Sequence, residues 1–415
     1  MAILNPFCGL RPSADKVSQV ACRPYDVLDS EEARIEAGDN SLSFYHVIKP
    51  EIDWPHGTDP YSSLIYQTGK KNFKKLVKSG VFTKDPAPYF YIYQLTMNGR
   101  TQTGIVGCAS VDDYMNDKIK KHELTRPVKE NDRKNHVRVS EINAEPVFFA
   151  YRDDPTIDFI TDRITREKPE YDFITADGIQ HTLWLVNDNH TIFQITEQFK
   201  KIPYLYVADG HHRTAAAALV GKELREANKN HTGTEEYNFF MAVVFPASQL
   251  KILDYNRLVK DLNGLSHENF LAKISESFNV VKLGGKEEFA PLEKHNFSMY
   301  LDGIWYSLTA KTGTFPKEHP IESLDVSILQ KNLFEPILGI LDQRTDKRID
   351  FVGGIRGLGE LSRRVDSGEM KVAFALYPVS INDLFKVADT GNIMPPKTTW
   401  FEPKLRSGLV VHSLR

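Results

Sequence analysis

The stretch that most constrains the fold is "YLYVADGHHRTAAAALVGKEL", residues 204–224. Its β-branched and aromatic residues favour a strand as far as Ala208, Asp209 and Gly210 form a turn signal, and the alanine-rich run favours a helix from about His212. A strand that turns tightly into a helix brings unpaired backbone N–H groups and the positive end of the helix dipole to one point. We therefore predict a site for phosphate or carboxylate at this turn.

The side chains of the turn suit an anion. Gly210 lets an anion approach the backbone, while His211, His212 and Arg213 can donate hydrogen bonds to it, Arg213 in a bidentate fork. The alternative is that the histidines cap or pack the helix and the arginine pairs with a carboxylate. Adjacent histidines also suggest zinc, but no HExxH motif completes a ligand set. We expect instead Mg²⁺ held by phosphates and one carboxylate, that of Asp209.

A second constellation is "KKHELTRPVKENDRKNHVR", residues 120–138, which predicts a helix over about 127–141. Basic residues recur along this helix about every four positions, which would place them on one stripe suited to a polyanion. They are Lys129, Arg133, Lys134 and Arg138. A solvated charged face is the alternative.

His122 and Glu123 directly precede that helix. A carboxylate beside a phosphate site can act as a general base toward a hydroxyl group, which makes Glu123 the more informative of the two.

Two further segments carry candidate residues. The first contains Arg11, and Asp26 follows within "RPYDV". Their local sequence alone indicates turns and does not mark either residue as functional. Near the C-terminus, "MPPKTTWFEPKLRSGL" presents Lys397 and Thr398 after two prolines. Rigid prolines that present lysine and threonine suit a phosphate clamp, and equally a surface tail.

Composition narrows the function class. The 415 residues carry a formal net charge of −3, which gives no overall field for nucleic acid or membranes. The three cysteines lack a CxxC spacing, and no apolar run is long enough for a membrane helix, so we expect a cytoplasmic protein. The chain contains no P-loop, no GxGxxG after a strand and no kinase HRD or DFG motif.

The order of patterns predicts an α+β protein. We expect helices over 60–79 and 192–200, and a hairpin around Asn98 and Gly99. Further strands are expected over 146–151 and on either side of a turn at Asp177 and Gly178. The predicted division is a phosphate-binding and catalytic domain over 1–248, an α+β domain over 249–385, and a segment over 386–415 that returns to the active site.

Four segments together resemble one family, that of domain of unknown function 1015. They are "PFCGLRPS" with "RPYDV", "HELT", "DGHHR" and "MPPKTTWFEPKLRSGL", and they span nearly the whole chain in the expected order. "LDYNRL" at 253–258 departs from the histidine-containing segment expected there. DGHHR also resembles the phosphate-contacting GxxR turn of ParB-like and sulfiredoxin-like folds, which include free-serine kinases. The resemblance implies a ParB/sulfiredoxin-like core elaborated by a second α+β unit.

The same resemblance implies a kinase that forms O-phosphoserine from free L-serine, with pyrophosphate or a nucleotide as donor and Mg²⁺ as cofactor. Glu123 would take the proton from the serine hydroxyl, with His122 beside it. By the resemblance, Gly210, His211, His212 and Arg213 hold the donor phosphates, and the kinase hypothesis adds Asp209, Lys397, Thr398 and Arg133 as donor-binding residues. The kinase hypothesis predicts that Arg11, Asp26 and Arg138 bind the substrate.

Other hypotheses use the same turn. One is a ParB-like regulator that binds a nucleotide or nucleic acid, and another is a phosphatase. The kinase hypothesis expects small-molecule partners, neither nucleic acid nor membrane, and leaves a homodimer open.

Overall fold

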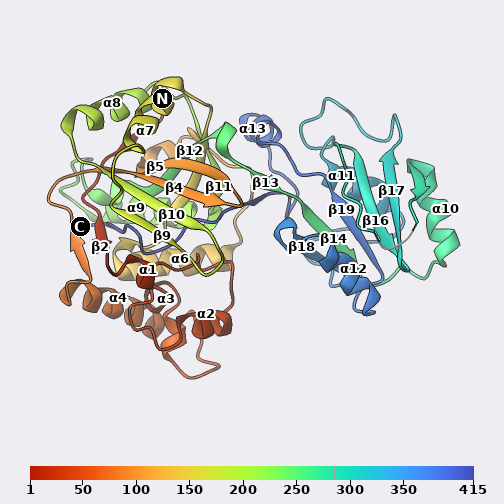
Figure 1. Ribbon diagram of the computed structural model, residues 1–415, viewed down its shortest axis with the longest axis horizontal. Coiled ribbons are helices and arrows are strands. Elements are labelled where there is room, and N and C mark those ends of the chain that lie inside the picture. Colours follow the sequence, from red (N-terminus) through yellow and green to blue (C-terminus); the bar gives the residue numbers. More distant parts are fainter. Residues whose placement is uncertain (285–286) are drawn as a thin grey trace. The chain divides into compact units, whose positions relative to one another are not determined.

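The computed structural model describes residues 1–284 and 287–415, and the chain divides into two compact units (Figure 1). Unit 1 comprises Met1–Leu250 and Pro403–Arg415, and unit 2 comprises Lys251–Glu402. The chain therefore leaves unit 1, forms unit 2 and returns to finish in unit 1. Both units mix helices with sheets, which confirms the predicted α+β class. Among the helices of the described residues, we find none that combines the length and apolar character needed to cross a membrane.

Unit 1 is built on a mixed sheet with nine strands in the described part of the chain. The strands run in the order β6, β11, β8, β12, β5, β4, β10, β9, and β1 pairs with β5. Their bounds are β1 Leu4–Asn5, β4 Phe90–Met97, β5 Arg100–Ser110, β6 Ile119–Lys120, β8 Val147–Tyr151, β9 Tyr171–Ile174, β10 Gln180–Val186, β11 Leu205–Asp209 and β12 Phe239–Pro246. Side chains such as Phe149, Val207 and Val244 belong to the core that this sheet buries.

The predicted hairpin is confirmed between β4 and β5. Met97 pairs with Arg100 across a two-residue turn. Asn98 and Gly99 have φ angles of 51° and 74°. Positive φ at both turn positions is typical of the tight turn that matches the twist of paired strands, and asparagine and glycine adopt it at low cost.

The helices of unit 1 cover this sheet and form a second core at the N-terminal side. Their bounds are α1 Val17–Val20, α2 Ser30–Ala37, α3 Tyr45–Ile48, α4 Ser63–Lys78, α5 Val111–Met115, α6 Pro127–Ser140, α7 Pro155–Ile164, α8 Asn189–Phe199 and α9 His211–Ala227. The rings of Phe44, Phe73 and Phe82 pack together in the second core. The helices predicted over 60–79, 127–141 and 192–200 are thus α4, α6 and α8.

Helix α9 packs closely because its inner face is small. Ala216 and Ala218 are fully buried. A Cβ atom at Gly221 would lie 2.4 Å from the carbonyl oxygen of Tyr237. The alanine-rich sequence that predicted a helix therefore also sets how near this helix approaches its neighbours.

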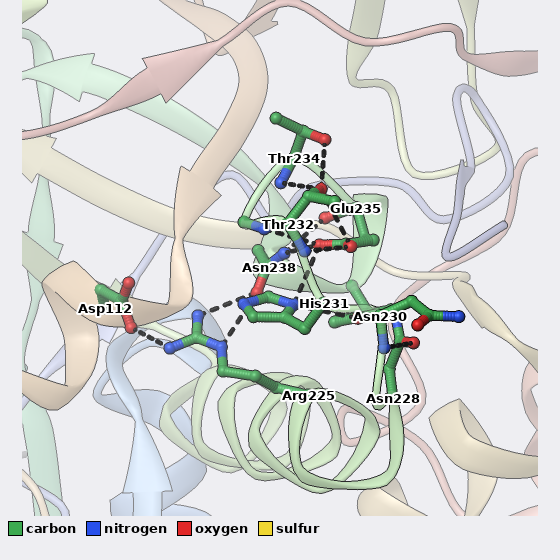
Figure 2. A network of polar contacts seen from close by, with 11 residues as sticks. Asp112, Arg225, Asn228, Asn230, His231, Thr232, Thr234, Glu235 and Asn238 are labelled. Carbon is green, nitrogen blue, oxygen red and sulfur yellow. Dashed lines mark hydrogen bonds and ion pairs between the residues drawn. The ribbon is translucent and has the colours of Figure 1, made fainter.

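The far end of α9 is fixed by polar contacts (Figure 2). Arg225 donates from Nε and Nη2 to Asn238 and from Nη1 to Asp112, at 3.1, 2.8 and 2.7 Å. Glu235 accepts hydrogen bonds from the backbone N–H of Thr232 and pairs with His231. These contacts hold the loop that leads from α9 into β12.

Unit 2 contains an antiparallel sheet with six strands among the described residues, in the order β15, β17, β16, β19, β14, β18. The strands of unit 2 are β13 Ile252–Leu253, β14 Tyr255–Val259, β15 Phe278–Lys282, β16 Asn296–Leu301, β17 Ile304–Ala310, β18 Ile349–Gly353, β19 Val372–Leu376 and β20 Trp400–Phe401. Its helices are α10 His267–Ser277, α11 Asp325–Leu329, α12 Gly359–Asp366 and α13 Ile381–Asp389. Leu361 of α12 packs in a core with Tyr300 and Trp305.

The last residues of the chain complete unit 1. Strand β21, His412–Ser413, pairs with β7, Ile142–Asn143, and strand β2, Leu10–Pro12, pairs with β3, Phe82–Lys84. The backbone N–H of Val411 donates to the carbonyl of Leu10 at 2.7 Å. Residues 403–415 therefore belong to unit 1, whereas residues 386–402 belong to unit 2.

Candidate functional site

The strand, turn and helix predicted over residues 204–224 are confirmed. The register of β11 shifts between Val207 and Asp209, as in a β-bulge, and such bulges re-aim the side chains that follow. Gly210 has φ of 86°, and α9 begins at His211 without a side-chain cap. A Cβ at Gly210 would lie 3.1 Å from Nε of Arg213. Glycine thus supplies the turn and lets the guanidinium lie against the backbone.

Asp209 forms an ion pair with a lysine close to the C-terminus. Lys404 donates from Nζ to Oδ2 of Asp209 at 3.0 Å, and the backbone N–H of Gly210 donates to Oδ1 at 2.9 Å. Burial raises the pKa of Asp209, but Lys404 and Arg213 outweigh burial and leave the pKa well below its usual range. The Asp209 carboxylate, directly before Gly210, is therefore ionised.

Arg213 lies beneath the turn and is 7% exposed. Its Nη1 donates to the carbonyl of Pro146 at 2.7 Å, and its Nη2 lies 3.8 Å from Oδ2 of Asp26. Burial lowers the pKa of Arg213, but Asp26, Glu145 and Asp209 outweigh burial and leave it raised. Among the described residues, Nε has no hydrogen-bond partner. Arg213 is thus a cation held in place whose Nε–H remains available to a ligand.

A second buried arginine lies behind Arg213. Arg133 pairs with Asp132 at 2.9 Å and lies 3.4 Å from Glu145. The guanidinium of Arg133 also covers the ring of Tyr25, 4.0 Å from its centroid. Burial raises the pKa of Glu145, which accepts a hydrogen bond from the backbone N–H of Tyr25 at 3.0 Å. A cavity of about 20 Å³ between the two arginines has room for a water molecule.

His211 connects the turn to the predicted base. Its ring meets that of His122 edge-on, with centroids 4.5 Å apart, and its Nδ1 lies 3.9 Å from Oε2 of Glu123. Burial lowers the pKa of His211 well below its usual value and that of His122 to about 4. Both rings are therefore neutral near pH 7. Nε2 of His211 has no hydrogen-bond partner among the described residues, and the side chain of Glu123 is 48% exposed.

His212 ties the start of α9 to the start of α6. Its Nε2 accepts a hydrogen bond from the backbone N–H of Arg126 at 3.0 Å, and Arg126 is the residue that caps α6. Burial lowers the pKa of His212. With Nε2 accepting, the ring proton of the neutral imidazole belongs on Nδ1, which leaves that atom as the donor of this side chain.

The predicted basic stripe on α6 is wrong as a continuous exposed surface. Arg133 is buried, while Lys134 and Arg138 share Glu223 at 2.5 and 3.6 Å. The helix turns one of its cations inward because Asp132 and Glu145 can compensate it there. Arg133 is therefore missing from the surface that the nucleic-acid hypothesis combines with the turn at Gly210.

Arg11, Lys397 and Thr398, which the sequence analysis also predicted, each make contacts of their own. Arg11 donates to Asp85 at 2.9 Å and to Glu170 at 2.6 Å. Lys397, which has φ of 56°, lies over the ring of Tyr255, and Thr398 donates to the carbonyl of Pro395. Both tail residues belong to unit 2. Roles for Arg11, Lys397 and Thr398 in binding stay predictions.

The structure also adds residues that the sequence interpretation missed. Lys404 lies seven positions beyond Lys397 in the same proline-interrupted segment, and the sequence analysis singled out Lys397 and not Lys404. Glu145 had no motif to mark it, whereas Tyr25 lies in the "RPYDV" segment but was not singled out there. Within the described residues, no group of three or more His, Cys, Asp or Glu side chains is placed to hold a metal ion.

Comparisons with known proteins place the chain in a family. A family model described as "Protein of unknown function (DUF1015)" matches residues 4–327. No curated protein matches.

Similar solved structures include a free serine kinase in complex with AMP, 14% identical, with a TM-score of 0.37 over 74% of this chain and 92% of that one. A conserved hypothetical protein from Pyrococcus furiosus is 15% identical, with a TM-score of 0.35 over 74% of this chain and 95% of that one. SbnI from Staphylococcus aureus, truncated at its C-terminus, is 12% identical, with a TM-score of 0.34 over 73% of this chain and 85% of that one. The family match covers most of the sequence, and the chain belongs to the DUF1015 family.

Proposed function

We propose that this protein is a small-molecule kinase that transfers a phosphoryl group from pyrophosphate, or from a nucleotide, to the hydroxyl group of free L-serine. The donor phosphates bind at the turn formed by Asp209, Gly210 and His211, with Arg213 beneath it. The products are O-phosphoserine and the donor without the transferred phosphoryl group, which is phosphate when the donor is pyrophosphate.

One observation carries the proposal: the first turn of α9 leaves several donors unsatisfied. Gly210 provides no side-chain cap for the first N–H groups of the helix, and Nε of Arg213 and Nε2 of His211 lack hydrogen-bond partners within the described residues. Nε2 of His211 is a donor in the tautomer that carries the ring proton on that atom. Buried donors without partners cost free energy, and an anion on the helix end would satisfy them after small side-chain rotations. Donor groups at catalytic sites often align only when the ligand binds.

The charges around the turn suit phosphoryl transfer, which needs positioning and charge neutralisation more than covalent chemistry. Arg213 and Lys404 supply fixed positive charge. A single carboxylate can hold Mg²⁺ when phosphates provide the other ligands, and we assign that carboxylate to Asp209. Mg²⁺ would neutralise charge on the phosphates.

Glu123 is the proposed base. Its carboxylate is half exposed and lies 3.9 Å from the ring of His211. A serine hydroxyl that approaches the donor from solvent would pass its proton to Glu123 as the new oxygen–phosphorus bond forms. The P–O bond to the rest of the donor breaks in the same step, and that remainder leaves as phosphate or as the nucleotide shortened by one phosphate. Buried His122 would hold His211 in place, because the two rings pack edge-on. Asp26 lies beside Arg213 and suits the ammonium group of the amino acid.

The proposal is tested by incubating the purified protein with L-serine, Mg²⁺ and, in separate reactions, pyrophosphate, ADP or ATP. We expect O-phosphoserine by mass spectrometry with at least one donor, and none without serine. If O-phosphoserine supplied alone is hydrolysed while no donor yields it from serine, the protein is a phosphatase. Absence of product with all three donors contradicts the kinase proposal.

A further inference from the structure

Unit 2 contains a cavity of about 130 Å³ with a buried carboxylate in its wall. Asp325, the first residue of α11, is 5% exposed. Its Oδ1 accepts a hydrogen bond from the backbone N–H of His295 at 2.9 Å. Its Oδ2 has no hydrogen-bond partner within the described residues. A buried carboxylate oxygen without a donor is costly, so its presence in a cavity wall points to a ligand that supplies one.

The groups around Asp325 do not supply a hydrogen-bond donor to its Oδ2. Burial raises its pKa to about 7, against the lowering effects of the His295 and Tyr377 backbone N–H groups and of Lys294. The backbone N–H of Tyr377 lowers the pKa of the carboxyl group, but within the described residues no group forms a hydrogen bond with Oδ2. Lys294 is engaged elsewhere, since its Nζ lies 2.5 Å from Asp383. With that pKa, part of the Asp325 carboxyl group is ionised near pH 7, and its Oδ2 can then accept a hydrogen bond from a ligand.

Opposite charge is available on the same cavity. Lys317 and Lys386 both line it, and Lys317 is exposed. Nζ of Lys386 makes a long contact of 3.3 Å with the carbonyl of Glu318. Burial lowers the pKa of His295, whose ring packs against Phe315, so this histidine adds no charge near pH 7. The cavity thus combines one acceptor without a partner, Oδ2 of Asp325, with two lysines that could bind a carboxylate.

We propose that this cavity binds a free α-amino acid with a small side chain. Its ammonium group would donate to Oδ2 of Asp325, and its carboxylate would lie between Lys317 and Lys386. A volume of about 130 Å³ is far below that of a drug-sized pocket and limits the ligand to a few heavy atoms. This proposal does not depend on the proposed kinase function, and the two are tested separately.

The test is hydrogen exchange measured by mass spectrometry on the full chain, because it locates binding. L-serine and L-alanine are titrated, with L-lactate as a control that keeps the carboxylate but replaces the ammonium group by a hydroxyl. We expect the amino acids to slow exchange in peptides covering 294–296, 317–325 and 377–386. L-lactate should leave these peptides unchanged.

The informative substitution is Asp325→Asn. The amide oxygen keeps the bond from the His295 N–H, while the amide nitrogen replaces an acceptor by a donor facing the ligand's ammonium group. Binding should weaken about tenfold or more. The double variant Lys317→Gln with Lys386→Gln should also weaken it, whereas Lys273→Gln, an exposed lysine of α10, should not.

The proposal is overturned if no amino acid protects these peptides, if L-lactate protects them equally, or if Asp325→Asn binds as the wild type does. Peptides of unit 1 around residues 209–213 report separately on the kinase site. Loss of the signal in unit 2 alone therefore leaves the kinase proposal untouched.

Discussion

Replacing Arg213 with lysine is expected to lower kcat/KM for phosphoryl transfer about a hundredfold or more while the protein stays folded. Lysine keeps a positive charge near Asp26 and Glu145 but lacks the planar fork of the guanidinium. It cannot bond to the carbonyl of Pro146 and reach a phosphate oxygen together. A hydrogen bond to a charged group contributes about 1.5–3 kcal/mol, so losing one or two in the transition state gives an effect of this size.

Helix α9 offers a matched control for this substitution. Arg225→Lys makes the same chemical change at the other end of the helix, where the arginine binds Asn238 and Asp112 (Figure 2). It should leave kcat/KM unchanged and lower only the unfolding temperature. Steady-state kinetics and thermal unfolding of both variants distinguish the two effects. Equal activity of Arg213→Lys and Arg225→Lys would remove Arg213 from the phosphate site.

Arg213→Ala is expected to destabilise the fold instead. It would leave buried Glu145 without one of its compensating charges. Removing one partner of a buried ion pair costs about 3–5 kcal/mol, so loss of activity in this variant would not by itself report on catalysis. The lysine variant is therefore the informative one.

Replacing Glu123 with glutamine should lower kcat by about 10²–10⁴ and change KM for the donor little. The amide cannot accept a proton from serine but has nearly the same shape. Because the side chain of Glu123 is half exposed, the unfolding temperature should remain that of the wild type. The measurement is kcat and KM for O-phosphoserine formation under each active donor.

Glu226→Gln is the control, since Glu226 is an exposed carboxylate of the same unit, on α9. It should retain full kcat. If Glu123→Gln retains full kcat as well, another group takes the serine proton, although the phosphate site itself would stand.

Local signals made part of this fold predictable. The Asn98 and Gly99 hairpin and the passage from strand through Gly210 into α9 depend on residues that are neighbours in sequence. The preferences of such residues act before any tertiary contact forms. The edges of the predicted helices over 127–141 and 192–200 lie within a few residues of α6 and α8 for the same reason.

Contacts between distant residues could not be predicted in this way. Arg133 looked like part of a solvated stripe because its partner Glu145 lies outside the helix and no motif marks it. Lys404 reaches Asp209 across 195 positions, which no spacing rule anticipates. Arg11 likewise pairs with Glu170, 159 positions away. Whether a charged side chain is buried depends on an oppositely charged partner, and the tertiary fold determines which residue that partner is.

The most direct test is a crystal structure of the protein with O-phosphoserine and Mg²⁺. We predict a phosphate group on the backbone N–H groups of the first turn of α9, within hydrogen-bond distance of Nε of Arg213 and with Glu123 facing the serine oxygen. A phosphate bound elsewhere, with the turn at Gly210 left empty, would contradict the account.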